Sequence, residues 1–204
     1  MKAASREALA SSQNRLDEIL AGDNNVATAA QAGLDIFEVV DVLDTDRELR
    51  VAFTDIAAPS EARKSLAENL FGSKISAGAL RIIQEAAAVQ WSTPKDFVKG
   101  LVSLGRRALL RGAESQGQLG QVEDELFRLS QILDREGELT QLLSDRTADS
   151  ARKRGLLANV LYGKVTMFTE ALVLQAISRP EQNPNDDVAA LADSAAVSYT
   201  HLTL

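Results

Sequence analysis

Two pairs of carboxylates are the clearest candidates for reactive chemistry in this sequence. Asp44 and Glu48 stand four residues apart, and the same spacing recurs at Asp134 and Glu138. Two carboxylates one helical turn apart could act as an acid and a base, or share a metal ion. The alternative, which we adopt, is that these charges lie at the starts of short helices and complement the helix dipole.

The other residues that carry chemistry are nearly absent. The chain has no Cys, and its only histidine, His201, lies near the end, so neither a His-centred triad nor a zinc site of several Cys or His ligands can form. Gly155 and Gly163 are not followed by the Lys-Ser or Lys-Thr of a phosphate-binding loop. The sequence therefore predicts no catalytic residue, no cofactor and no metal.

Two further features have alternative interpretations. Arg106, Arg107 and Arg111 could form a basic patch for an acidic partner, although a solvated helix face is the simpler interpretation. Trp91 could anchor an interface or pack in the core of a bundle.

Composition favours a helical protein. The 204 residues are 45% hydrophobic but only 4% aromatic, and Ala and Leu are abundant. A net charge of −7 argues against nucleic-acid binding. The chain has no apolar run long enough to span a membrane, and its first residues lack the apolar centre of a signal peptide. We therefore expect a soluble, cytoplasmic protein.

The sequence also repeats itself at an offset of 90 residues. Positions 37–101 match positions 127–191 at 16 of 65 places, where chance would give about five. The identical pairs include Phe37/Phe127, Leu43/Leu133, Asp44/Asp134, Leu49/Leu139, Asp55/Asp145, Leu66/Leu156, Lys74/Lys164 and Pro94/Pro184. This pattern predicts a tandem duplication of one helical unit.

Apolar spacing and capping residues predict the helices of each copy. The first copy should contain helices at about 3–21, 27–43, 46–56, 59–71 and 77–90, with a sixth beginning at Pro94. In the second copy we expect short helices at about 136–144 and 167–178. The predicted helix starts are Pro59, Ser76, Thr93, Thr147, Thr166 and Asn183.

The apolar faces of these helices follow from the same spacing. Val122, Leu126, Leu129 and Leu133 should form one buried face, and the short helices should pack through Leu49 with Phe53 and through Leu139 with Leu142. The predicted fold is all-α, with two tandem duplicated bundles of about six helices each, joined by a continuous helix. The bundles should span residues 1–104 and 105–196.

The stretches LFRLSQILDREGELTQLLSDRTADSARKRGLLANVLYGKVT and ALVLQAISRPEQNP resemble the delta subunit of bacterial rotary ATP synthase, in its duplicated actinobacterial form. The first copy is similar throughout. The resemblance implies a non-catalytic stator subunit that resists rotor torque, peripheral on the cytoplasmic face of the plasma membrane and touching the membrane only through the complex. It implies two partners, the amino-terminal helix of an alpha subunit and the b subunits. The alternative is a tandem helical adaptor for another partner; an enzyme would need a site that the residues do not supply.

In this family the alpha-subunit helix lies in a groove formed chiefly by the first and fifth helices of the bundle. The resemblance carries this groove onto Leu9, Leu16, Leu80 and Ile83 in the first copy, and onto Leu109, Leu172, Val173 and Ala176 in the second. Interior packing is the alternative for each residue, and either copy could keep the groove. The first two helices of each copy, rich in Ala, should be the least protected from hydrogen exchange.

The end of the chain departs from the family pattern. The carboxy-terminal domain that holds the b subunits in the family is not found here, so we expect a protein truncated before that domain. Residues 197–204, which include SYTHLTL, lack the preceding helical pattern and resemble a translated adaptor sequence. We therefore expect this segment to be a non-native tail.

Overall fold

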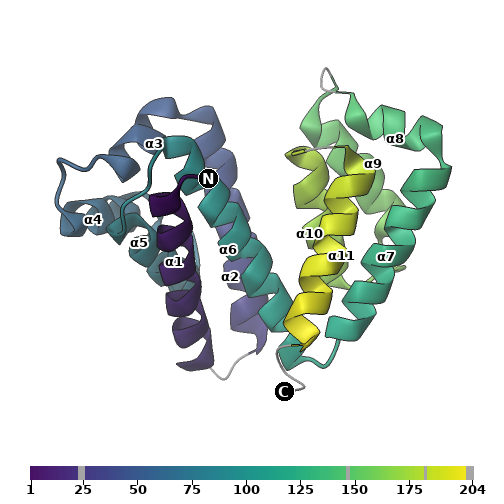
Figure 1. The fold of residues 1–204 in the computed structure, drawn as a ribbon, viewed down its shortest axis with the longest axis horizontal. Helices are drawn as coiled ribbons and strands as arrows, with labels where there is room; N and C mark the ends of the chain where they lie inside the picture. The colour runs from purple at the N-terminus through teal and green to yellow at the C-terminus, as the bar shows by residue number, and fades with distance from the viewer. Residues whose placement is uncertain (23–25, 146–147, 182, 201–204) are drawn as a thin grey trace. The chain divides into compact units, whose positions relative to one another are not determined.

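Helices make up all the regular structure in the part of the chain that the computed structural model describes, residues 1–22, 26–145, 148–181 and 183–200 (Figure 1). These residues hold eleven α-helices and no strand, so the all-α fold class is confirmed. The chain folds as two compact units, Met1–Gly112 (unit 1) and Ala113–Leu204 (unit 2). Their origin by duplication and the predicted bundle boundaries stay predictions.

Unit 1 contains six helices: α1 (Ala3–Gly22), α2 (Val26–Thr45), α3 (Arg47–Thr54), α4 (Ser60–Phe71), α5 (Ala77–Ala88) and α6 (Pro94–Ser115), the last of which continues beyond the unit. Helix α5 is central, since α1, α2 and α4 all pack against it. It can fill this place because Ala79, Ile82, Ile83 and Ala86 are almost fully buried and cover more than one side of the helix.

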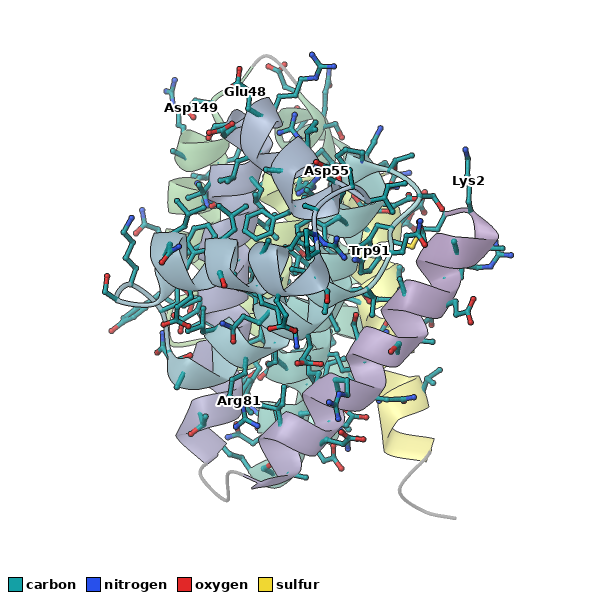
Figure 2. All side chains as sticks on the ribbon, turned by 90° about the vertical axis from the view of Figure 1, so that its left-hand side faces the viewer. Lys2, Glu48, Asp55, Arg81, Trp91 and Asp149 are labelled. Carbon is teal, nitrogen blue, oxygen red and sulfur yellow. The ribbon has the colours of Figure 1, made fainter. Side chains whose placement is uncertain are left out.

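The core of unit 1 is built around aromatic side chains. Phe53 stacks on Phe71 and on Phe97, with ring centroids 6.4 and 5.6 Å apart. Trp91 meets Phe97 edge to face, and its indole N–H donates a 2.8 Å hydrogen bond to the carbonyl of Ala86. The Trp91 side chain, labelled in Figure 2, is only 3% exposed. Of the two interpretations of Trp91, core packing therefore holds.

Unit 2 contains α7 (Leu119–Arg135), α8 (Gly137–Ser144), α9 (Ser150–Leu161), α10 (Met167–Ser178) and α11 (Pro184–Thr200). Helices α7 and α11 pack extensively on each other, and α10 packs on α7, α9 and α11. The predicted face of α7 is confirmed, because Val122, Leu126, Leu129 and Leu133 are all buried.

The predicted caps that fall on described residues are also confirmed. Ser76 and Thr166 accept hydrogen bonds from the backbone N–H groups of Ala79 and Thr169 at the starts of α5 and α10. Thr93 and Asn183 do the same for Asp96 and Asp186. Pro59, expected in the first turn of its helix, is instead the cap residue, since α4 begins at Ser60. Thr147 lies outside the described residues, and the cap of α9 is Asp149, which accepts from Ala151 N–H.

Several polar contacts recur in the two units at residues 90 positions apart. Asp35 accepts from the N–H of Ser76 at 2.7 Å, and Glu125 accepts from the N–H of Thr166 at 2.9 Å. Arg63 and Lys153 are both buried, and each donates to backbone carbonyl oxygens that include that of Asp55 or Asp145. These matched contacts support the predicted duplication.

Two expectations for unit 2 are altered by the structure. In α8 the buried residue is Leu143, at 1% exposed, whereas Leu142 is 53% exposed; pairing Leu139 with Leu142 as the packing face was wrong. The 90-residue offset of the repeat predicts Leu143 as the buried residue, because Leu143 corresponds to Phe53, which is buried in unit 1. Residues 197–200, which were expected to lack the preceding helical pattern, continue α11; residues 201–204 lie outside the described part, and the assignment of 197–204 to a non-native tail stays a prediction.

The junction between the two sequence copies is a single helix. Helix α6 runs from Pro94 to Ser115 without a break and ends where Gly117 takes a positive φ of 67°. A left-handed residue at this position favours glycine and stops the helix. The continuous helix is confirmed; the rigid pairing of the bundles that we expected from it stays a prediction.

Candidate partner-binding surface

The seam between α1 and α5 in unit 1 is where the sequence places a partner groove. Helix α1 faces the unit with Ser5, Ala8, Ser12, Leu16 and Ile19, all of which are buried. Three of these five side chains are small, so α1 can approach its neighbours closely but buries little apolar area. Polar contacts with α5 and α6 add to this attachment.

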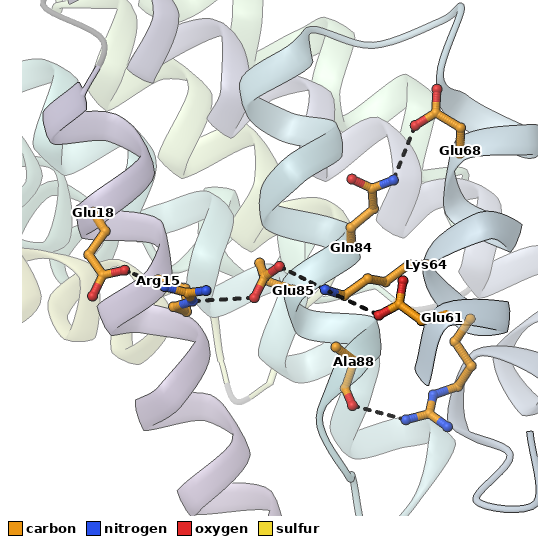
Figure 3. Close-up of polar contacts among 9 residues, drawn as sticks. Arg15, Glu18, Glu61, Lys64, Glu68, Gln84, Glu85 and Ala88 are labelled. Atoms are coloured by element: carbon orange, nitrogen blue, oxygen red, sulfur yellow. Dashed lines mark hydrogen bonds and ion pairs between the residues drawn. The ribbon is translucent and has the colours of Figure 1, made fainter. Parts of the chain in front are cut away.

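One of these contacts is a chain of charges that crosses three helices (Figure 3). Arg15 of α1 lies 2.6 Å from Glu18 and 3.3 Å from Glu85 of α5, and Lys64 of α4 lies 3.1 Å from the same Glu85 carboxylate. Partial burial opposes ionisation of Glu85, but hydrogen bonds and charge from Lys64 and Arg15 outweigh it and lower the pKa of Glu85. Glu85 therefore ties α1 and α4 to the central helix.

A second contact joins α1 to α6. Both arginines Arg107 and Arg111 reach Asp17, with nitrogen–oxygen distances of 2.5 and 3.0 Å. Partial burial raises the pKa of Asp17, but the hydrogen bonds and charges of the two arginines exceed this effect and lower it overall. Arg107 and Arg111 thus form ion pairs with Asp17 inside unit 1. Neither interpretation of these arginines from the sequence, a basic patch for a partner or a solvated helix face, predicted this pairing.

Small polar groups complete the attachment of α1. Ser5, fully buried, donates to the Asp96 carboxylate at 2.8 Å and accepts from the N–H of Ser92 at 2.9 Å. Gln13 donates a longer 3.4 Å bond to Ser103. Sequence reasoning missed all of these residues, because partners about 90 positions apart leave no local signal.

Seven of the eight predicted groove residues are buried, and the eighth is half-buried. Leu9 is half-buried and packs against the core of unit 1. The other seven are buried: Leu16, Leu80, Ile83 and Leu109 in unit 1, and Leu172, Val173 and Ala176 in unit 2. Leu16 on α1 and Leu80 and Ile83 on α5 belong to one apolar cluster, whereas Leu109 lies on α6 beside Gly33. Interior packing accounts for these positions, and their role as a groove stays a prediction.

The two residues of each carboxylate pair lie on different helices, so the dipole interpretation is right for Glu48 and Glu138 and wrong for Asp44 and Asp134. Glu48 and Glu138 lie in the first turns of α3 and α8, as the dipole interpretation predicts. Asp44 instead lies near the end of α2 and Asp134 near the end of α7. Among the described residues, no group of three or more His, Cys, Asp or Glu side chains is arranged to hold a metal ion. No helix in that part of the chain is both long and apolar enough to cross a membrane.

Glu125 is a partly buried carboxylate of unit 2 with a structural role. Glu125 accepts hydrogen bonds from the N–H and hydroxyl of Thr166 and from the hydroxyl of Thr169, at 2.9, 3.0 and 2.6 Å. Partial burial of Glu125 works against these bonds, which nevertheless lower its pKa. The ionised carboxylate lies at the start of α10, where it also complements the helix dipole.

Comparisons with known proteins show which family this chain resembles. A family model described as ATP synthase delta (OSCP) subunit matches residues 107–183. The ATP synthase subunit delta of Corynebacterium aurimucosum is 73% identical over 196 residues, which are 96% of this chain and 72% of that protein. The subunits delta of Corynebacterium glutamicum strain R and Corynebacterium diphtheriae are 62% identical over 196 residues and 57% identical over 203.

These similarities, which cover almost the whole chain, place it in the ATP synthase delta (OSCP) subunit family. Subunits of this family are non-catalytic parts of the peripheral stalk of ATP synthase, so the chain is not an enzyme by itself.

Proposed function

We propose that this chain links the catalytic head of a proton-translocating ATP synthase to its peripheral stalk and resists the torque of the rotor. The observation that carries the proposal is 73% identity over 96% of the chain to an ATP synthase subunit delta. The partner on the head is the amino-terminal helix of an alpha subunit. The b subunits are the partner on the stalk, which members of the family hold through a carboxy-terminal domain that is not among the residues described here.

The fold suits this role on physical grounds. An amphipathic helix laid along two helices binds through buried apolar area and requires no reactive group. In unit 1 the proposed contact follows α1 and α5, with the half-buried Leu9 at its edge and Leu16, Leu80 and Ile83 beneath. In unit 2 the predicted residues are Leu172, Val173 and Ala176 of α10, whereas Leu109, which the sequence assigned to the second copy, lies in unit 1 beside Gly33. The complex would lie on the cytoplasmic face of the plasma membrane, with this chain peripheral to it.

Calorimetric titration with a synthetic alpha-subunit amino-terminal helix tests the proposal. We expect saturable binding with a negative heat-capacity change, because apolar surface is buried. Its stoichiometry reports whether one groove or two are used. Leu9→Gln should weaken binding, whereas Leu20→Gln, a change in another half-buried leucine of α1, should not. Absence of binding by the folded chain would contradict the proposed contact.

A further inference from the structure

Helix α9 and the start of α10 expose a group of apolar side chains in unit 2. Leu156 and Val160 lie one turn apart on the same side of α9 and are 44% and 48% exposed. Tyr162 follows at the end of α9 with 79% of its surface exposed, and Met167 opens α10 at 49%. We call these four residues the α9 face. Large apolar side chains grouped on a surface commonly mark a place where another molecule binds.

The corresponding residues of unit 1 show that this exposure is not required by the fold. Leu66 and Leu70 stand 90 positions before Leu156 and Val160, and both are partly buried against the core of unit 1. Tyr162 and Met167 correspond to Gly72 and Ala77, which present little or no side chain. Unit 2 therefore carries an apolar surface at positions where unit 1 covers or lacks one.

Helix α9 itself carries charges of one sign, although Asp149 caps its start, Glu170 lies in the first turn of α10 and Glu125 bonds to the start of α10. Residues 150–169 contain four cations and no Asp or Glu, although residues 113–204 as a whole hold fourteen acidic residues against eight basic ones. Arg152 and Lys164 are exposed, and Lys153 is buried where it donates to the carbonyl of Leu143. The equivalent stretch 60–79 of unit 1 includes Glu61 and Glu68. The helix that carries Leu156 and Val160 is thus locally basic on an acidic unit.

We propose that the α9 face is a docking surface for an acidic amphipathic helix of a partner protein. Apolar residues of that helix would cover Leu156 and Val160, while its carboxylates would lie near Arg152 and Lys164. Docking of two α9 faces on each other is disfavoured, because both carry positive charge. An anionic membrane is a poorer match, because two exposed cations give only a weak attraction to such a surface. The negative charge of the rest of unit 2 would oppose that contact.

The probe for this proposal is a synthetic helix with Leu along one side and Glu along the other, cross-linked to keep it helical. Its control has the same Leu residues with Lys in place of Glu. Both are titrated into the full chain at low and moderate salt, with binding followed by calorimetry and by amide chemical shifts. We expect the Glu helix to bind, to weaken as salt is added, and to shift the amides of α9 and of Met167.

Variants separate this surface from others. Leu156→Gln combined with Val160→Gln should weaken binding of the Glu helix about tenfold or more, as loss of a central apolar contact does. Val51→Gln changes a similarly exposed residue of unit 1 and should leave the affinity unchanged. Chemical-shift mapping on the unaltered chain keeps the test valid if the double variant folds poorly.

Several results would overturn the proposal. Equal affinity for the Glu and Lys helices would show that charge does not select the partner, and shifts confined to other helices would place binding elsewhere. Binding to vesicles rich in anionic lipid, without binding of the Glu helix, would assign the face to a membrane. Self-association abolished by the double variant would assign it to a second copy of the chain.

Discussion

Arg63 supplies the most quantitative test of how unit 1 is held together. Its side chain is 8% exposed and donates hydrogen bonds to four backbone carbonyls: those of Asp55, Ala58, Ala87 and Ala88, at 3.1, 2.6, 2.7 and 3.0 Å. Two of these carbonyls belong to the last turn of α5 and have no partner within the helix. The guanidinium therefore closes the end of α5 and fixes the connection between α3 and α4.

Replacing Arg63 with methionine keeps an apolar stem and removes every donor. Each carbonyl left without a partner in a buried place costs about 1–3 kcal/mol, and water will reach some of them. Removal of a buried charge returns part of this loss. We therefore expect Arg63→Met to lower the free energy of unfolding of unit 1 by about 3 kcal/mol, which corresponds to a fall of roughly 12–24 °C in Tm.

Urea unfolding followed by tryptophan fluorescence measures this change. Trp91 is the only tryptophan and is buried in unit 1, so its fluorescence reports that unit. Arg63→Lys should lose less than Arg63→Met, because Lys153 makes two such carbonyl contacts at the matching place in unit 2. Arg81→Met, a change in an exposed arginine of α5 labelled in Figure 2, should stay within about 0.5 kcal/mol of wild type. An Arg63→Met variant as stable as Arg81→Met would refute the reasoning.

Three further predictions concern the attachments of helices. Asp17→Asn should lower the free energy of unfolding of unit 1 near pH 7 by about 1 kcal/mol. Because folding lowers the pKa of Asp17, the ionised carboxylate stabilises wild type less as the pH falls. Urea titrations should therefore show the two proteins becoming more alike in stability toward about pH 3. A difference that grows with acidity would contradict it. Gly105→Ala should lower the free energy of unfolding by about 1–3 kcal/mol, because the added Cβ would lie 2.5 Å from the Phe37 ring. The added Cβ of Gly155→Ala would meet nothing within 4 Å, so this change should stabilise α9. Thermal unfolding compares the two variants. Equal effects would be inconsistent with that contact. Glu125→Ala should speed hydrogen exchange of the Thr166 N–H at the cap of α10, because the carboxylate that accepts from it is lost; unchanged exchange would count against the role of Glu125 as an anchor.

Local chemistry explains which features could be predicted from the sequence. Ser76, Thr93, Thr166 and Asn183 cap helices through groups three residues away, so their types and positions suffice. The apolar spacing of α7 likewise determines its buried face. The eight residues of α8 were too few for this, because Leu142 and Leu143 differ by one position and only the packing of neighbouring helices selects between them.

Long-range contacts explain what could not be predicted. Nothing near Asp17 in the sequence indicates that Arg107 and Arg111 will meet it, since the pairing depends on how α1 crosses α6. Burial of Arg63 was equally hidden, because an arginine in a helix is usually exposed. The α9 face was recognised only by comparing exposure between the two units, although the absence of acidic residues from 150 to 169 was readable in the sequence.

The most direct test of the proposed role is binding to a catalytic head. The head of the ATP synthase of Corynebacterium glutamicum, whose subunit delta is 62% identical to this chain over 196 residues, would be stripped of its own subunit delta and mixed with the purified chain. Analytical ultracentrifugation should show co-sedimentation with the intact head. It should show none with a head whose alpha subunits lack their amino-terminal helices. Binding that survives removal of those helices, or no binding to the intact head, would contradict the account.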